Sequence, residues 1–174
     1  MQCNNVLFLD MDGVINGGRL DNILCLPMKN AEGREIDATI WSLECIQPFL
    51  ELMKWCKSNN ISIVISSTWR IGMTPELFNE YFQRYFDRND IAEVVGVTNV
   101  RLKPYMHRGR EIEDYLLEHP EIERYICIDD SIEDIAERIP GWNIYQTSVH
   151  TGLTNQDIIK IKERWNKLYV KKEI

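Results

Sequence analysis

Two pairs of aspartates are the residues whose type and spacing could perform chemistry. Asp10 and Asp12 are separated by one residue at the end of a short apolar run, and Asp129 and Asp130 close a second such run. Carboxylates this close together are costly to remove from water unless a cation shares them. Because oxygen-only ligation suits magnesium, we expect a Mg²⁺ site that takes a substrate phosphate as a further ligand.

Hydroxyl and basic side chains follow two other apolar runs. Ser66 and Ser67 come directly after one run and offer hydroxyl and N–H groups suited to phosphoryl oxygens. The basic residues after the other run, together with Arg70, are Arg101, Lys103, His107, Arg108 and Arg110. Carboxylates, a hard cation, a hydroxyl and a basic group around one point describe a phosphoryl-transfer site, in which one aspartate can attack phosphorus.

Five short apolar runs must position these residues. They lie at 6–9, 61–65, 92–97, 125–128 and 142–145. Each run has the length of a strand and is mostly uninterrupted, as in strands that are covered on both faces. Because open parallel sheets bind ligands beyond the carboxyl ends of their strands, we expect the aspartates to converge at that edge.

Segments with helical spacing alternate with the apolar runs. They lie at about 48–57, 74–86, 108–118, 132–139 and 154–172. Pro48 suits a first helical position, and Thr154 with Asp157 is typical of a capping box. The alternation predicts an α/β fold of the Rossmann-like, three-layer α/β/α type, with a mainly parallel sheet of about five strands.

Composition narrows the class of protein. The 174 residues predict a single domain, and 27 acidic against 20 basic residues give a net charge of −7. The whole molecule should therefore not grip nucleic-acid phosphates strongly, although a local basic patch remains possible. Five cysteines without a C-x-x-C pair indicate neither a disulfide framework nor a zinc knuckle. We expect a cytoplasmic protein with no signal peptide, no membrane span and no obligate protein partner.

The order of these motifs resembles the haloacid dehalogenase-like (HAD) superfamily of phosphohydrolases. The matching residues are Asp10-x-Asp12-Gly13 after a strand, Ser66 after a second strand, a basic residue before a helix, and Asp129-Asp130. The strings FLDMDGVIN, SSTWR and RGREI also resemble the small phosphatase-type domains of predicted RNA-repair proteins. The resemblance covers residues 5 to about 153 and implies a HAD-like core.

The resemblance implies a role for each residue of the first two motifs. Asp10 would be the nucleophile and a magnesium ligand. Asp12 would protonate the leaving group and later activate water, and its backbone carbonyl would also contact the metal. Ser66 would bind the phosphoryl group, with Ser67 as the alternative if the strand is one residue longer.

The last two motifs carry the remaining roles. Alignment with the superfamily's G-D-x-x-x-D form favours Asp130 over Asp129 as the direct metal ligand and would place Asp129 toward the base or a metal-bound water. Asp134 is then a helix-surface acid. The third motif departs from the usual lysine, and Arg108 is favoured over Lys103, because it starts a helix and can make a forked contact. Arg70 is expected to contact substrate.

Residues 17–41 form a possible small flap, too short for a separate cap domain, which normally needs about 40 residues. An open site would admit a bulky phosphate ester. The sequence therefore predicts a magnesium-dependent phosphatase that acts through an aspartyl-phosphate on a nucleotide or a nucleic-acid end phosphate. The alternatives are a non-catalytic phosphate-binding or protein-interaction module, and a small-molecule phosphatase or phosphotransferase.

Overall fold

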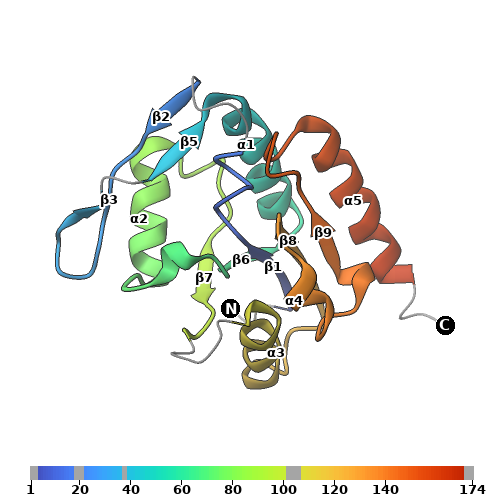
Figure 1. The fold of residues 1–174 in the computed structure, drawn as a ribbon. Coiled ribbons are helices and arrows are strands. Elements are labelled where there is room, and N and C mark those ends of the chain that lie inside the picture. The colour runs from blue at the N-terminus through green and yellow to red at the C-terminus, as the bar shows by residue number, and fades with distance from the viewer. Residues whose placement is uncertain (1–3, 18–21, 37–38, 101–106, 171–174) are drawn as a thin grey trace.

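The computed structural model describes residues 4–17, 22–36, 39–100 and 107–170. A five-stranded sheet with the order β7-β6-β1-β8-β9 forms its centre, and all neighbouring strands are parallel (Figure 1). The strands are β1 (Asn5–Leu9), β6 (Ser62–Ile65), β7 (Val94–Val97), β8 (Arg124–Asp129) and β9 (Ile144–Gln146). The predicted parallel sheet is confirmed, and its carboxyl ends meet at one edge.

Helices cover both faces of the sheet because the strand side chains alternate between two apolar clusters. Leu7 and Leu9 belong to the larger cluster, whereas Val6 and Phe8 belong to the smaller one. The larger cluster packs under α1 (Leu43–Ser58), α2 (Pro75–Tyr85) and α5 (Asn155–Val170). The smaller one packs under α3 (Arg108–Glu118) and α4 (Glu133–Ala136). This is the expected three-layer α/β/α arrangement.

Local signals placed some element ends correctly and others wrongly. Thr74 and Thr154 both accept hydrogen bonds from backbone amides in the first turns of α2 and α5, as N-caps do. Pro48 does not begin a helix, because α1 starts at Leu43 and contains Pro48 in its second turn. Trp142 is not part of a strand but of the short 3₁₀ helix η2 (Gly141–Asn143), which precedes β9.

The insertion expected at 17–41 forms two small antiparallel sheets. One pairs β2 (Ile23–Cys25) with β5 (Ile40–Ser42), and the other pairs β3 (Met28–Lys29) with β4 (Glu35–Ile36). These sheets rest on α2: Trp41 Nε1 donates to Tyr81 Oη at 2.6 Å, and Tyr85 Oη donates to the Pro27 carbonyl at 3.0 Å. The described insertion is thus fastened to the core.

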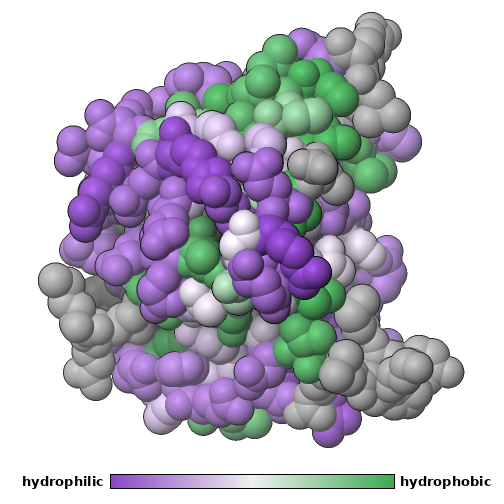
Figure 2. All heavy atoms as spheres, turned by 90° about the vertical axis from the view of Figure 1, so that its left-hand side faces the viewer, coloured by the Kyte–Doolittle hydropathy of each residue, from purple (hydrophilic) through white to green (hydrophobic). Residues whose placement is uncertain are grey.

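The face that carries the insertion is mostly hydrophilic, with an apolar area in its upper part (Figure 2). Three apolar side chains of β2 and the start of α1 are exposed, namely Ile23, Leu24 and Leu43. Within the described ranges, no helix has the length and apolar character that crossing a bilayer requires. The four cysteines that the structure describes are free thiols.

Candidate active site

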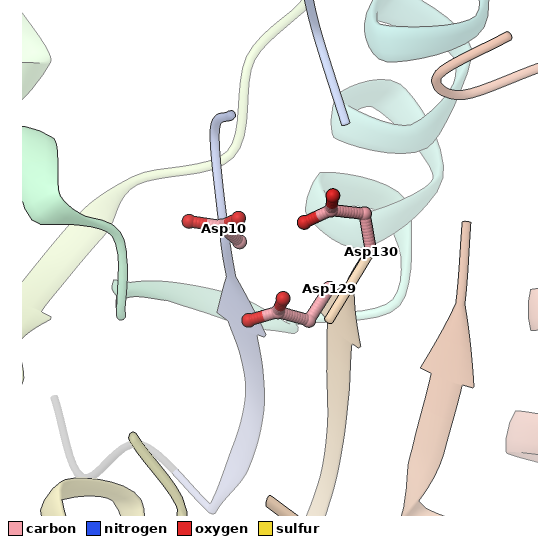
Figure 3. Close-up of side chains that lie close together, drawn as sticks. All are labelled: Asp10, Asp129 and Asp130. Carbon is pink, nitrogen blue, oxygen red and sulfur yellow. The ribbon is translucent and has the colours of Figure 1, made fainter. Parts of the chain in front are cut away.

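Three aspartates meet at the carboxyl edge of the sheet. Asp10 follows β1, Asp129 ends β8 and Asp130 comes next, so that carboxylate oxygens of all three lie within 4.8 Å of one another (Figure 3). The Asp10 amide donates to the Ile128 carbonyl at 3.0 Å, which continues the pairing of the two strands beyond β1. Asp10 and Asp129 are buried, while Asp130 is half-buried.

Gly13 lets the Asp130 carboxylate approach the first motif. Its φ is +68°, and a Cβ at this position would lie 2.2 Å from Asp130 Cγ. The turn is held by the Gly13 amide, which donates to Asn16 Oδ1 at 2.7 Å, and by Thr147, whose hydroxyl donates to the Gly13 carbonyl at 3.2 Å. Only glycine combines this backbone conformation with this approach.

Arg108 places a positive charge between two of the aspartates. Its Nη1 lies 2.5 Å from Asp129 Oδ2 and 3.0 Å from Asp10 Oδ1. Arg108 is the first residue of α3, and its backbone amide donates to Asp134 Oδ2 at 2.6 Å. The favoured third-motif residue is therefore at the cluster. Asp134 is not a simple surface acid, because its carboxylate caps the helix that carries Arg108.

Close packing of α3 on α4 fixes this cap. A Cβ on Gly109 would lie 2.4 Å from the Asp134 carbonyl oxygen and 2.9 Å from the Ile135 Cα. In this pair of motif residues, Arg108 supplies a charge to the site, and Gly109 lets α3 pack closely on α4 because it has no side chain.

The acidic groups of the site have shifted pKa values. Burial, and then the neighbouring Asp129 charge, raise the pKa of Asp10 to about 7, although Arg108 and a hydrogen bond with the Ser67 side chain act in the opposite direction. Burial also raises the pKa of Asp129, which Arg108 counteracts. Burial by itself would lower the pKa of Arg108, but the charges of Asp10 and Asp129 outweigh it and raise that pKa.

A divalent cation fits this cluster. Asp10 Oδ1 is buried and has no hydrogen-bond partner among the described residues, although Arg108 Nη1 lies 3.0 Å away. An unpaired buried oxygen beside two further carboxylates is costly without a cation. Asp10, Asp129 and Asp130 supply the hard oxygen donors that magnesium prefers. The Asp12 side chain is not part of this cluster, which leaves only its backbone carbonyl for the expected metal contact.

Three side-chain donors that were not predicted from the sequence hold the Asp12 carboxylate. Its Oδ1 accepts from Asn16 Nδ2 at 2.8 Å and from Trp69 Nε1 at 3.0 Å, and its Oδ2 accepts from Thr68 Oγ1 at 3.2 Å. Its side chain is exposed, whereas Asp10 is buried. Thr68 and Trp69 are in the SSTWR string, which was the one signal that could have identified them.

The two serines after β6 are both buried, but they differ in their contacts. Ser67 lies close enough to Asp10 to lower the pKa of that carboxyl, and its hydroxyl accepts from the Trp69 amide at 3.4 Å. The Ser66 amide donates to the Leu9 carbonyl at 2.9 Å and continues the sheet. Which serine binds a phosphoryl group stays a prediction, and the proximity to Asp10 favours Ser67, the alternative, over Ser66, the first expectation.

Arg70 does not face a substrate. It is 4% exposed, its Nε donates to the Thr98 carbonyl at 2.9 Å, its Nη1 donates to the Ser67 carbonyl at 2.6 Å, and its Nη2 lies 2.5 Å from Glu111 Oε2. The expected substrate contact is thus replaced by internal bonds that shape the loop after β6. No sequence signal identified Glu111 as its partner, 41 residues away. Lys103 and Arg101 lie outside the described residues.

The comparison with known proteins agrees with this geometry. Residues 6–158 match the family described as the HAD domain in Swiss Army Knife RNA repair proteins. No curated protein matches the chain. The match covers most of the chain and includes the strand ends that carry the aspartates and the serines, and the helix that carries Arg108. The chain therefore belongs to this family of HAD domains and has a Rossmann-like α/β core, and the family suggests a phosphatase-type function.

Proposed function

We propose that this chain is a magnesium-dependent phosphatase that hydrolyses phosphate monoesters through a phosphorylated Asp10. The observation that carries the proposal is the state of Asp10: a buried carboxylate, with one oxygen that lacks a hydrogen bond, between two aspartates and an arginine. A carboxylate freed from water and held at a cationic site is suited to attack a phosphoryl group.

The reaction has two halves. In the first, an Asp10 oxygen bonds to phosphorus as the bond to the ester oxygen breaks, and Asp12 gives the leaving oxygen its proton. In the second, Asp12 takes a proton from water, the water oxygen bonds to phosphorus, and the bond to Asp10 breaks, which releases inorganic phosphate. Asp12 suits this role because its exposed side chain can reach both the leaving group and solvent.

The other residues of the site would neutralise and orient the phosphoryl group. A bound magnesium ion would neutralise phosphoryl oxygens, and Asp10, Asp129 and Asp130 would hold it. Arg108 would share its guanidinium between the aspartates and a phosphoryl oxygen. The Ser67 hydroxyl, beside Asp10, would donate to another phosphoryl oxygen.

The leading substrate class is a phosphate at a nucleic-acid end or on a nucleotide. Two features support it: the described family consists of domains of RNA repair proteins, and the short insertion leaves no room for a cap domain of its own. A polymer end needs such an open approach, because the rest of the strand must remain outside the site.

Hydrolysis of a chromogenic phosphate monoester with magnesium tests the activity. Asp10→Asn should abolish turnover while the thermal unfolding midpoint stays near that of the wild type. Glu137→Gln, an exposed acid on the same side of the sheet as α4, is the matched control and should keep full activity. Turnover by Asp10→Asn would reject the nucleophile. No turnover by the wild type on any ester would favour a non-catalytic phosphate-binding module.

A substrate panel then tests the class. The panel compares oligonucleotides phosphorylated at the 3′ or 5′ end with mononucleotides and sugar phosphates, each at the same concentration. We expect the highest kcat/KM for an oligonucleotide end. A preference for sugar phosphates would reject the nucleic-acid assignment while leaving the phosphatase assignment in place.

A further inference from the structure

A second concave site lies between η2 and α5, away from the aspartates. Its volume is about 440 Å³, within the usual range of about 300 to 1,000 Å³ for small-ligand pockets. It is lined by Gly141, Trp142, Tyr145, Lys160, Glu163, Arg164, Lys167 and Leu168. Because Gly141 and Trp142 precede β9, whereas the aspartates follow the carboxyl ends of their strands, the pocket opens toward the other end of the sheet.

Three cations share one side of this pocket. Lys160, Arg164 and Lys167 are spaced by four and three residues, which places them on one face of α5. Arg164 is fixed, because its Nη1 donates to the Gly141 carbonyl at 2.9 Å and also to the Ile144 carbonyl. Glu163 is the one acid in the lining. The pocket is therefore positive in a chain whose net charge is −7.

Some cations on the surface are neutralised by a neighbouring acid. Lys54 lies 3.3 Å from Asp90, and Arg138 lies 3.6 Å from Glu113, so that each is neutralised by a neighbour. Lys160 and Lys167 are exposed, and neither forms an ion pair within the part of the chain that the structure describes. Their charges remain available to an anion.

Aromatic surface lies beside these charges. The Trp142 side chain is 57% exposed, although tryptophan is usually covered in a folded domain. The Arg164 guanidinium carbon lies 5.7 Å from the centre of the Tyr145 ring, which closes the floor of the pocket. An exposed indole next to phosphate-binding cations is the combination with which proteins hold unpaired nucleotides, since every base can stack on an aromatic face.

We propose that this pocket is a contact site for single-stranded nucleic acid, with a base against Trp142 and backbone phosphates at Lys160 and Lys167. The inference rests on the proposed function, since it concerns how the strand whose end reaches Asp10 is held. It assigns binding to a surface apart from the aspartates. Binding and hydrolysis should therefore be separable by substitution.

Fluorescence anisotropy with a labelled single-stranded RNA of about 12 nucleotides, without terminal phosphates, tests the site. Lys160→Gln with Lys167→Gln should weaken binding about tenfold at low salt. It should also flatten the plot of log K against log salt by about 1.4, because two phosphate contacts are lost from a single strand. Trp142→Leu should weaken binding about fivefold at an unchanged slope, because it removes stacking but no charge.

The matched control is Lys29→Gln with Arg88→Gln, which makes the same charge change on β3 and in the segment after α2, at residues that do not line the pocket. It should leave affinity and slope as in the wild type. All these variants should hydrolyse a small phosphate ester at the wild-type rate. If that hydrolysis is absent from the wild type while RNA binding is intact, the proposed function fails and the pocket assignment stands.

Three results would overturn the pocket assignment. One is equal RNA affinity and slope for the pocket variant and the control variant. Another is the absence of RNA binding by the wild type at low salt. The third is displacement of the RNA by polyglutamate as readily as by unlabelled RNA, which would indicate a surface for acidic proteins.

Discussion

Arg70 and Glu111 form an ion pair with 2.5 Å between Nη2 and Oε2, and at most 3% of either side chain is exposed. Arg70 ends the short 3₁₀ helix η1 (Thr68–Arg70) after the serines, whereas Glu111 lies one turn after Arg108 in α3. The pair therefore ties the segment that carries Ser67 to the helix that carries Arg108. Both site residues depend on a contact that lies beneath the site.

Breaking this pair should cost stability. Glu111→Gln leaves the buried Arg70 charge without its counter-charge, and we expect a loss of about 3 to 5 kcal/mol in the free energy of unfolding by urea. Glu113→Gln, which breaks the exposed pair with Arg138, should cost less than about 1 kcal/mol. Arg70→Met combined with Glu111→Leu should lose less than Glu111→Gln. Equal losses for Glu111→Gln and Glu113→Gln would contradict the buried tie.

Gly13→Ala should damage both the turn and the metal site. The new Cβ would overlap the Asp130 carboxylate in a backbone with positive φ, and we expect a loss of about 1 to 3 kcal/mol with weaker magnesium binding in calorimetry. Gly33→Ala separates the two causes, because Gly33 also has positive φ but nothing lies within 4 Å of its added Cβ. That variant should lose about 1 kcal/mol and bind magnesium normally. Normal magnesium binding by Gly13→Ala would reject the role of Asp130.

Replacement of Asp130 should abolish magnesium binding, and it should not lower the unfolding temperature of the metal-free protein. Magnesium should raise the thermal unfolding midpoint of the wild type, because an ion that binds only the folded state stabilises it. Asp130→Asn should abolish this rise. Without magnesium, the same variant should unfold at an equal or higher temperature than the wild type, because it relieves repulsion among crowded carboxylates. A magnesium-dependent rise as large as that of the wild type would exclude Asp130 as a ligand.

Trp69 should matter most when the leaving group needs a proton. Trp69→Phe keeps a ring but loses the N–H that donates to Asp12, so that Asp12 is less well positioned. We expect kcat to fall about tenfold for an alkyl phosphate and little for a nitrophenyl phosphate, whose leaving group departs as an anion. Trp55→Phe, a tryptophan that packs on Trp165 away from the site, is the control. An equal fall for both esters would indicate a structural role alone.

The sequence by itself determined the sheet, most helices and the convergence of the aspartates. Apolar runs of strand length that alternate with helical spacing have few solutions other than a parallel sheet covered on both faces, and this sheet forms. Parallel strands bring their carboxyl ends to one edge, and this is why Asp10 and Asp129 meet although 118 residues lie between them. The helix starts at Thr74 and Thr154 could be predicted because an N-cap involves only neighbouring residues.

Only the tertiary structure decided which polar side chains face the site. Ser67 lies beside Asp10 because the path of the chain beyond β6 brings it there. Arg70 is buried because it forms an ion pair with Glu111. Asp134 caps α3 because α4 packs closely on Gly109. The physical reason is the same in each case. Such contacts join residues that are far apart in the chain, whereas periodicity and spacing depend only on residues that are close together in the sequence.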